Sequence, residues 1–536
     1  MERPIHYQVF WAIMAVLLLN SFLSTSVTSG KWFRLSSDLL FLLPLLIIAT
    51  SFSKRPNYWI HLFSILICIL GLYRFLNLLT DLIFHRPFSF FDVLLIPELD
   101  YLVNQSLTTI EKSFLVLSIL IIAMVSYTFI FLFSRLLTKS FSLSIKNTTA
   151  GILLGFGLIV FIQFLVILKE GSNFSLTRGP YIKDFIYFFD RAIKDVRLNE
   201  NQYLLKQEIK LANSSLDENA YDLSRLSNTN VIVIFIESYG AVLVENPDLL
   251  NPYKKFYSEM QTLLEKKSFS MVSGYSEAPD GSWNSRLSFS TGTNITHRYI
   301  ANLAMVSNLT TLNQKFSQLN HTTLSFMPGV TEPVLYIETF FDFQNRIRFW
   351  NLDWPKDKSF VGWPVIPDQY ALEWLGRKPT LKNITPFYAE IVLSSSHSPF
   401  GRVPSYITDG TFNLEDYHSR IQGKKDSLSI FSYLESSPEK YMISIEYSLR
   451  SSFDFILKYL DKEDLIILIG DHQPPVHRTD SFLVPVHIIS GNRSLLSPFK
   501  KLGFQKELFS LEVKRNISHE DFAQFILESY SSHQRE

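Results

Sequence analysis

The hydrophobic pattern divides the chain into two unlike parts, with long apolar runs before residue 170 and shorter runs after it. A membrane-spanning helix needs about 20 apolar residues to cross about 30 Å of hydrocarbon. The runs that qualify cover residues 8–27, 37–52, 57–80, 113–134 and 150–168. The second run is the weakest candidate, because it is short and contains Pro44. We therefore predict a multi-span α-helical membrane domain of about five helices over residues 1–168.

The orientation of this domain follows from its basic residues. The first run lacks a small-residue cleavage site and is followed by further spans, which favours a retained helix over a signal peptide. Lys and Arg are enriched in the N-terminal segment and in the second and fourth loops, so the N-terminus is predicted to be cytoplasmic. The residues behind this bias are Arg3, Lys54, Arg55, Arg135, Lys139 and Lys146. An odd number of spans then places the rest of the chain outside the cytoplasm. The apolar loop 81–112 is either an interfacial amphipathic helix or a packing connection.

From residue 229 the pattern changes to short β-branched runs separated by longer helical stretches. Such strands indicate a mostly parallel central sheet covered by helices on both faces, that is, an α/β domain over residues 229–536. The polar stretch 169–228 is predicted to be a juxtamembrane linker. The predicted strands are residues 230–237, 322–328, 387–396, 464–470 and 485–490.

Composition excludes several classes of protein. The 50 basic and 50 acidic residues balance, which argues against a nucleic-acid-binding protein. A hydrophobic content of 47% excludes an intrinsically disordered chain. Cys68 is the only cysteine, so neither an intramolecular disulfide nor a cysteine-based zinc site can form.

Polar residues at the carboxyl ends of the predicted strands are the candidate site, because α/β sheets bind ligands there. Glu237 ends the first strand, His397 follows the third, and Asp471 and His472 follow the fourth directly. Oxygen and nitrogen donors of these types bind divalent metals, although a Gly-Asp-His turn alone is more often structural. Burying Glu237, Asp471 and His472 together would be costly without a cation, so the combination favours a metal site.

The segment after Asp280 supplies a candidate nucleophile. Gly281 and Ser282 open a helical stretch, and a helix N-terminus favours an anion because its backbone N–H groups are unpaired. A metal lowers the pKa of a serine hydroxyl and makes it nucleophilic. The alternative from the local sequence is a plain serine N-cap.

The order Glu237, Ser282, His397 and Gly470-Asp471-His472 resembles that of the alkaline phosphatase superfamily. The chain is most similar to its membrane-anchored, sulfatase-like branch, which includes lipoteichoic acid synthases, phosphoglycerol transferases and lipid A phosphoethanolamine transferases. The resemblance implies an extracytoplasmic sulfatase-like domain behind about five spans. Its most specific segments are Gly281-Ser282-Trp283, Met327-Pro328-Gly329, Gly362-Trp363 with Pro367-Asp368-Gln369-Tyr370, and Gly470 to Pro475.

The resemblance also implies roles for individual residues. Glu237, Asp471 and His472 match metal ligands, and Ser282 matches the residue that both ligates the metal and attacks phosphorus. His397 matches the histidine that contacts the transferred phosphoryl group or its leaving group. The implied cofactor is one divalent ion, manganese or zinc, with magnesium as a further possibility.

The chain departs from these relatives in places. Ser282 stands where threonine is usual, and Asn284 replaces the proline of the formylglycine motif of sulfatases, although Arg286 has the matching offset. For Arg286 the alternatives are a phosphate contact and a solvated or Glu-paired helix arginine; for Asp368 they are a place in the cleft and a helix cap. The further substrate-binding candidates are Asp280, Arg286, Asp368 and His477, with Tyr370 and Arg478 as weaker ones.

The function expected from the resemblance is transfer of a phospholipid head group to an envelope glycan or lipid through a phospho-serine intermediate. The membrane lipid is the donor, nucleic acid is not a partner, and the protein is expected in the bacterial cytoplasmic membrane. The alternatives are a metal-dependent hydrolase of phosphate or sulfate esters and a catalytically silent envelope scaffold.

Overall fold

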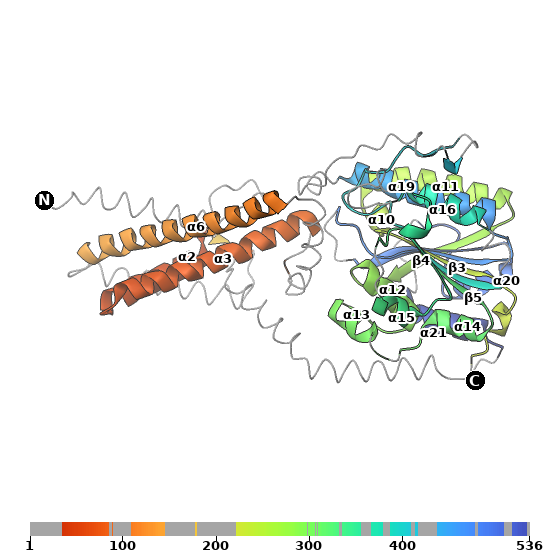
Figure 1. Ribbon diagram of the computed structural model, residues 1–536, viewed down its shortest axis with the longest axis horizontal. Coiled ribbons are helices and arrows are strands. Elements are labelled where there is room, and N and C mark those ends of the chain that lie inside the picture. The colour runs from red at the N-terminus through yellow and green to blue at the C-terminus, as the bar shows by residue number, and fades with distance from the viewer. Residues whose placement is uncertain are drawn as a thin grey trace. The chain divides into compact units, whose positions relative to one another are not determined.

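The computed structural model divides into two compact units, residues 1–82 with 86–198 and residues 83–85 with 199–536 (Figure 1). The structure describes residues 35–84, 88, 109–144, 177–178 and 221–532, the last range with gaps at 297, 306, 308, 332–334, 355–365, 379–385, 409–412, 416, 418–436, 477–480 and 509–516.

The described part of the N-terminal unit consists mainly of apolar helices. They are α2 (Ser37–Phe52), α3 (Pro56–Phe84) and α6 (Thr109–Ser144), beside the short strands β1 (Leu35–Ser36) and β2 (Thr177–Arg178). Segments Pro56–Asn77 and Leu117–Leu136 are long and apolar enough to cross a membrane. Helix α2 is confirmed as a helix, but at 16 residues it is shorter than the about 20 that a span needs. The predicted spans 8–27 and 150–168 lie outside the described residues.

The C-terminal unit is built on an eight-stranded sheet in the order β10-β4-β9-β8-β3-β7-β5-β6. The strands are β3 (Val231–Ile236), β4 (Ser270–Glu277), β5 (Thr322–Met327), β6 (Asn345–Arg348), β7 (Phe387–Val392), β8 (Leu465–Gly470), β9 (Leu483–Ser490) and β10 (Ile517–Ser518). Only β9 runs antiparallel to its neighbours, so the sheet is mixed but mostly parallel. All five predicted strands are present, whereas β4, β6 and β10 were not predicted.

Helices cover both faces of this sheet, as the apolar runs predict (Figure 1). One face carries α10 (Val242–Glu245), α11 (Pro247–Lys266), α16 (Asp368–Arg377) and α19 (Pro438–Tyr459). The other carries α12 (Ser282–Thr291), α13 (Arg298–Met305), α14 (Leu312–Gln318), α15 (Leu335–Phe341), α20 (Arg493–Lys501) and α21 (His519–Tyr530). Alternate residues of β3 enter the two cores: Ile232, Ile234 and Ile236 face the first, and Val231, Val233 and Phe235 the second.

Helix α11 shows how the sequence sets the first of these layers. Asn246 precedes the helix and its side chain accepts a hydrogen bond from the Asp248 N–H (2.9 Å), while Pro247 takes the first helical position. The buried side chains then recur every three or four residues, which turns one stripe of the helix toward the sheet. These side chains are Leu249, Tyr253, Phe256, Tyr257, Met260 and Leu264.

Strands β3 and β8 approach closely where both end. A Cβ atom added to Gly470 would lie 2.0 Å from the carbonyl oxygen of Tyr239, so only glycine fits there. Just beyond, the Asp471 N–H donates to the carbonyl of Ile236 (3.2 Å). This contact brings the residues that follow the two strands together at one edge of the sheet.

We expect Gly470→Ala to lower the thermal unfolding midpoint of the full-length protein in detergent. Overpacking of this kind costs about 1–3 kcal/mol, and here the obstacle is backbone, which cannot rotate away. Gly71→Ala is the matched control, because its added Cβ meets nothing within 4 Å. Equal midpoints for Gly470→Ala and the wild type would contradict the close approach of β3 and β8.

Candidate active site

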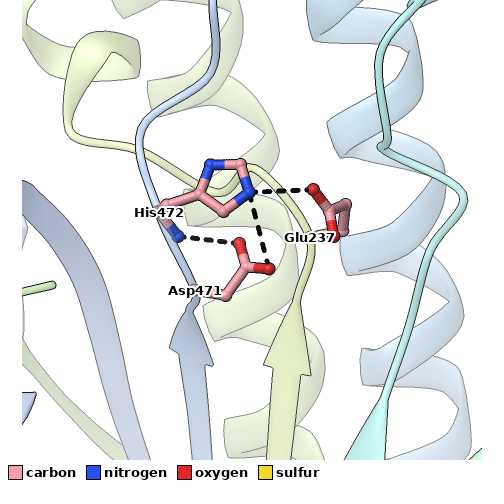
Figure 2. A group of neighbouring side chains, drawn as sticks. All are labelled: Glu237, Asp471 and His472. Atoms are coloured by element: carbon pink, nitrogen blue, oxygen red, sulfur yellow. Dashed lines mark hydrogen bonds and ion pairs between the residues drawn. The ribbon is translucent and has the colours of Figure 1, made fainter. Parts of the chain in front are cut away.

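Three predicted metal ligands meet at the carboxyl ends of β3 and β8. Glu237 follows β3, and Asp471 and His472 follow β8, its parallel neighbour. Nε2 of His472 lies 3.1 Å from Oε1 of Glu237 and 3.8 Å from Oδ2 of Asp471. Figure 2 shows the three side chains pointing toward one another. Their ligand atoms all lie within 4.8 Å of one another, so the geometry gathers them into one cluster.

The cluster fits a single divalent cation. Oδ2 of Asp471 is buried and accepts no hydrogen bond from the described residues, and its nearest cationic neighbour is Nε2 of His472 at 3.8 Å. Metal bonds to such oxygen and nitrogen ligands are about 2.0–2.2 Å long, so ligand atoms 3.1 and 3.8 Å apart can share one ion. Two carboxylates and one imidazole suit manganese, zinc or a similar divalent ion.

The protonation of the cluster reflects the cost of burying its charges. Burial and the nearby Glu237 carboxylate raise the pKa of Asp471 to about 7. Burial opposes ionisation of Glu237 too, but the charges of His397 and His472 outweigh it and hold the Glu237 pKa well below its usual range. Burial alone would lower the pKa of His472, yet the charges of Asp471 and Glu237 raise it well above its usual value. Without a cation, protons therefore offset the buried negative charge.

Ser282 joins this cluster from the start of α12. Its hydroxyl donates a hydrogen bond of 3.0 Å to Oε2 of Glu237. Gly281, the residue before the helix, has φ +90°, which L-residues with a side chain rarely adopt. The Ser285 N–H closes the first helical turn on the Gly281 carbonyl (3.0 Å). The nucleophile candidate therefore occupies a helix N-terminus beside the candidate ligands, as the Gly-Ser step predicts.

The turn after Glu237 contributes groups that sequence reasoning missed. Ser238 has φ +56°, a left-handed conformation for a non-glycine residue, and its N–H donates to Oδ1 of Asp471 (2.7 Å). Its hydroxyl donates to Oε1 of Glu237 (3.0 Å). The phenol of Tyr441 donates to the Ser238 carbonyl (2.8 Å) and accepts from the Gly240 N–H (3.3 Å). Nothing local in the sequence marks Tyr441, which lies on α19, far along the chain.

His397 approaches the same cluster from the end of β7. Its N–H donates to the Ser394 carbonyl (3.1 Å), which forms a tight turn, and Nδ1 lies 2.5 Å from the Ser398 carbonyl. Because a carbonyl only accepts, Nδ1 carries a proton. Ser396 in the same turn donates to the Glu237 carbonyl (2.5 Å). Positive charge on His397 is one of the causes that lower the Glu237 pKa.

The remaining candidates have different surroundings. Arg286 is buried and donates to Glu390 (2.7 Å), so it takes the Glu-paired arrangement. Asp280 is exposed, and its charge contributes to raising the His472 pKa. Asp368 is fully buried among hydrogen bonds and does not line a surface. His477 and Arg478, as well as Gly362 and Trp363, lie outside the described residues.

The segment Gln473-Pro474 after His472 is held by hydrogen bonds and close packing. Gln473 donates from Nε2 to the Leu483 carbonyl (2.8 Å) and accepts from the Val242 N–H (3.3 Å). A Cβ atom on Gly240 would lie 2.0 Å from Oε1 of Gln473 and 2.5 Å from Cδ of Pro474. This loop therefore packs directly on the turn that follows Glu237.

No protein-family model and no curated protein sequence matches this chain. Solved structures similar to it include the lipoteichoic acid synthase LtaP of Listeria monocytogenes, with 14% identity, 52% of this chain and 71% of that chain covered, and a TM-score of 0.36. A protein in the alkaline phosphatase superfamily from Vibrio parahaemolyticus has 15% identity, coverages of 59% and 73%, and a TM-score of 0.35. The phosphoglycerol transferase GacH of Streptococcus pyogenes, in complex with sn-glycerol-1-phosphate, has 14% identity, coverages of 54% and 75%, and a TM-score of 0.32.

These solved structures are of the kinds of protein that the sequence motifs resemble. Because these identities and TM-scores are low, roles are assigned to individual residues from the geometry of this chain alone.

The pKa shifts predict how metal binding responds to pH. Asp471, with a pKa of about 7, and His472, with a raised pKa, hold protons below neutrality, and a cation binds only their deprotonated forms. As the pH falls below about 7, Mn²⁺ affinity should therefore weaken, by about tenfold per pH unit for each displaced proton. Titration of the full-length protein, with free Mn²⁺ followed by electron paramagnetic resonance at pH 6.0 and 7.5, measures this effect.

Glu237→Gln is the control for this titration, since loss of a ligand should weaken Mn²⁺ binding at both pH values. Equal wild-type affinities at pH 6.0 and 7.5 would show that no proton is displaced and would contradict the assigned ligands.

Proposed function

We propose that this protein is a membrane-anchored, metal-dependent phosphotransferase that moves a phospholipid-derived head group onto an envelope glycan or lipid. The head group is of the phosphoglycerol or phosphoethanolamine type, and the intermediate is a phospho-serine on Ser282. The observation that carries the proposal is the hydrogen bond of 3.0 Å from the Ser282 hydroxyl to Glu237, within a buried cluster suited to a divalent cation.

Glu237, Asp471, His472 and Ser282 would hold one manganese or zinc ion. When bound, such an ion lowers the pKa of a serine hydroxyl and withdraws charge from phosphoryl oxygens. Glu237 accepts the Ser282 hydrogen bond and so orients the oxygen lone pairs. The first N–H groups of α12 are available to an anion at the same place, because the first turn of a helix leaves them unpaired.

The reaction then has two displacements at phosphorus. The Ser282 oxygen attacks the head-group phosphodiester, its bond to phosphorus forms, and the bond from phosphorus to the diacylglycerol oxygen breaks. Diacylglycerol leaves with the proton that Ser282 has lost. A hydroxyl of the acceptor then attacks the same phosphorus, the bond from phosphorus to the Ser282 oxygen breaks, and the acceptor's proton passes to that oxygen, which restores the serine. His397 contributes positive charge toward the non-bridging oxygens or the leaving group.

The apolar helices support a lipid donor. Segments Pro56–Asn77 and Leu117–Leu136 would retain the chain in the membrane, where phospholipid is concentrated. We place the protein in the bacterial cytoplasmic membrane, with its N-terminus cytoplasmic and its catalytic unit outside.

Replacement of the nucleophile gives the most direct test. Ser282→Ala should lower turnover of a fluorescent phospholipid by at least about a thousandfold, as for other nucleophiles, while Mn²⁺ still binds through the remaining ligands. Ser282→Thr should remain active, because threonine keeps the hydroxyl at the same helix position. Ser285→Ala, on the same helix, is the matched control: its buried hydroxyl contacts no described hydrogen-bonding group, so activity should stay near that of the wild type. Full activity in Ser282→Ala would refute the assigned nucleophile.

The acceptor distinguishes transfer from hydrolysis. Purified full-length protein with labelled phospholipid should show a head-group adduct on Ser282 by mass spectrometry, and product only after a glycan or lipid acceptor is added. Free head group without an acceptor would instead identify a hydrolase. If the purified protein shows neither turnover nor stoichiometric metal, a catalytically silent envelope scaffold would be favoured.

A further inference from the structure

Asp368 stands at the start of α16, and hydrogen bonds surround its side chain. Oδ1 accepts from the backbone N–H groups of Ser394 (3.1 Å) and Ser395 (3.2 Å). Oδ2 accepts from the Ser448 hydroxyl of α19 (2.7 Å) and lies 3.2 Å from the same Ser395 N–H. The Asp368 N–H in return donates to the Ser395 hydroxyl (2.8 Å). One carboxylate thus ties α16 and α19 to the turn after β7.

That turn reaches the candidate active site at two points. The Ser396 hydroxyl donates to the backbone carbonyl of Glu237 (2.5 Å), the residue whose side chain is a candidate ligand. His397 closes the turn through its N–H to the Ser394 carbonyl (3.1 Å) and acts electrostatically on Glu237. A shift of the turn would therefore displace His397 and loosen the support of Glu237 together.

The Asp368 carboxylate does not cap α16, because Pro367 precedes the helix and the carboxylate accepts its hydrogen bonds from the turn after β7 and from α19. The cost of burying it therefore needs another explanation. Asp368 has 0% exposure, and burial raises its pKa to about 6. Serine or asparagine caps a helix without a buried charge. Only a carboxylate offers two acceptor oxygens, which here receive two backbone N–H groups and a hydroxyl at once.

We infer that Asp368 is a positioning residue of the proposed phosphoryl transfer. Its carboxylate fixes the turn Ser394–His397, and through it the places of His397 and the Glu237 backbone, without touching the substrate. The reaction in this inference is that of the proposed function; the positioning itself depends only on the hydrogen bonds described.

The chain offers a matched control in Asp464. This aspartate is also buried, with 4% exposure, and burial also raises its pKa to about 6. It accepts from the Asn230 side chain (2.8 Å) and from the Asp461 N–H (2.9 Å). Asp464 directly precedes β8, whereas Asp471 directly follows it. Asp464 therefore lies at the other end of the strand from the site.

The test compares Asp368→Asn with Asp464→Asn in the full-length protein, with a phospholipid donor and saturating Mn²⁺. Both variants should unfold at a lower temperature. Only Asp368→Asn should lower kcat, by about ten- to a hundredfold as for other supporting residues, with KM for the lipid and Mn²⁺ affinity within about threefold of the wild type. An equal kcat loss in both variants, or wild-type kcat in Asp368→Asn, would overturn the inference. A rise in KM alone would also overturn it and indicate substrate contact.

A second variant and a second readout keep the inference testable. Ser448→Ala removes one hydrogen bond from Oδ2 and should lower kcat in the same direction but less, even if Asp368→Asn does not fold. Diethyl pyrocarbonate labelling of His397, mapped by mass spectrometry, should change in rate in the Asp368 variant and not in the Asp464 variant. This readout needs no turnover, so an inactive wild type would count against the proposed function, and unchanged labelling against the positioning role.

Discussion

The candidate active site at the carboxyl ends of β3 and β8 depends on the proximity of two buried carboxylates, Glu237 and Asp471. Such a pair is unfavourable unless a cation or protons offset its charge, and the raised pKa of Asp471, about 7, expresses that cost. The backbone is arranged to keep the pair together in spite of it. Gly470 allows β8 to approach the turn after β3, and Ser238 adopts a left-handed conformation so that its N–H meets Asp471. Strain and charge at this edge are offset by the two large cores on either side of the sheet.

Each element of the site is held by a buried polar contact from a different part of the fold. Tyr441 on α19 holds the turn after Glu237, and Asp368 on α16 holds the turn before His397. Arg286, one turn after Ser282, pairs with Glu390 of β7 and so connects the helix that carries Ser282 to a central strand. These contacts order the groups before any substrate arrives, which is the condition under which oriented charges stabilise a transition state most.

The sequence predicted the centre of this arrangement because local signals mark it. Continuous apolar strands end at Glu237 and Asp471, and a Gly-Ser step opens the helix at Ser282. Strand β4 was missed because its sequence, SMVSGYSE, mixes polar and apolar residues that are nevertheless nearly all buried. The roles of Arg286 and Asp368 could not be decided, because their partners lie 104 and up to 80 residues away along the chain. Periodicity predicts elements, but only tertiary packing determines which distant polar groups become partners.

The single cysteine bears on how the C-terminal unit is stabilised. Cys68 lies in α3, so the unit that carries the site has no disulfide and depends on its two cores. The site lies at the carboxyl ends of the strands. Its charged residues, Glu237, Asp471 and His472, belong to neither core. A fold arranged in this way can vary the loops at that edge without disturbing the cores, since loop changes there remove no core contact. The Gln473 loop lies at that edge, because it packs on Gly240 beside the cluster of Glu237, Asp471 and His472.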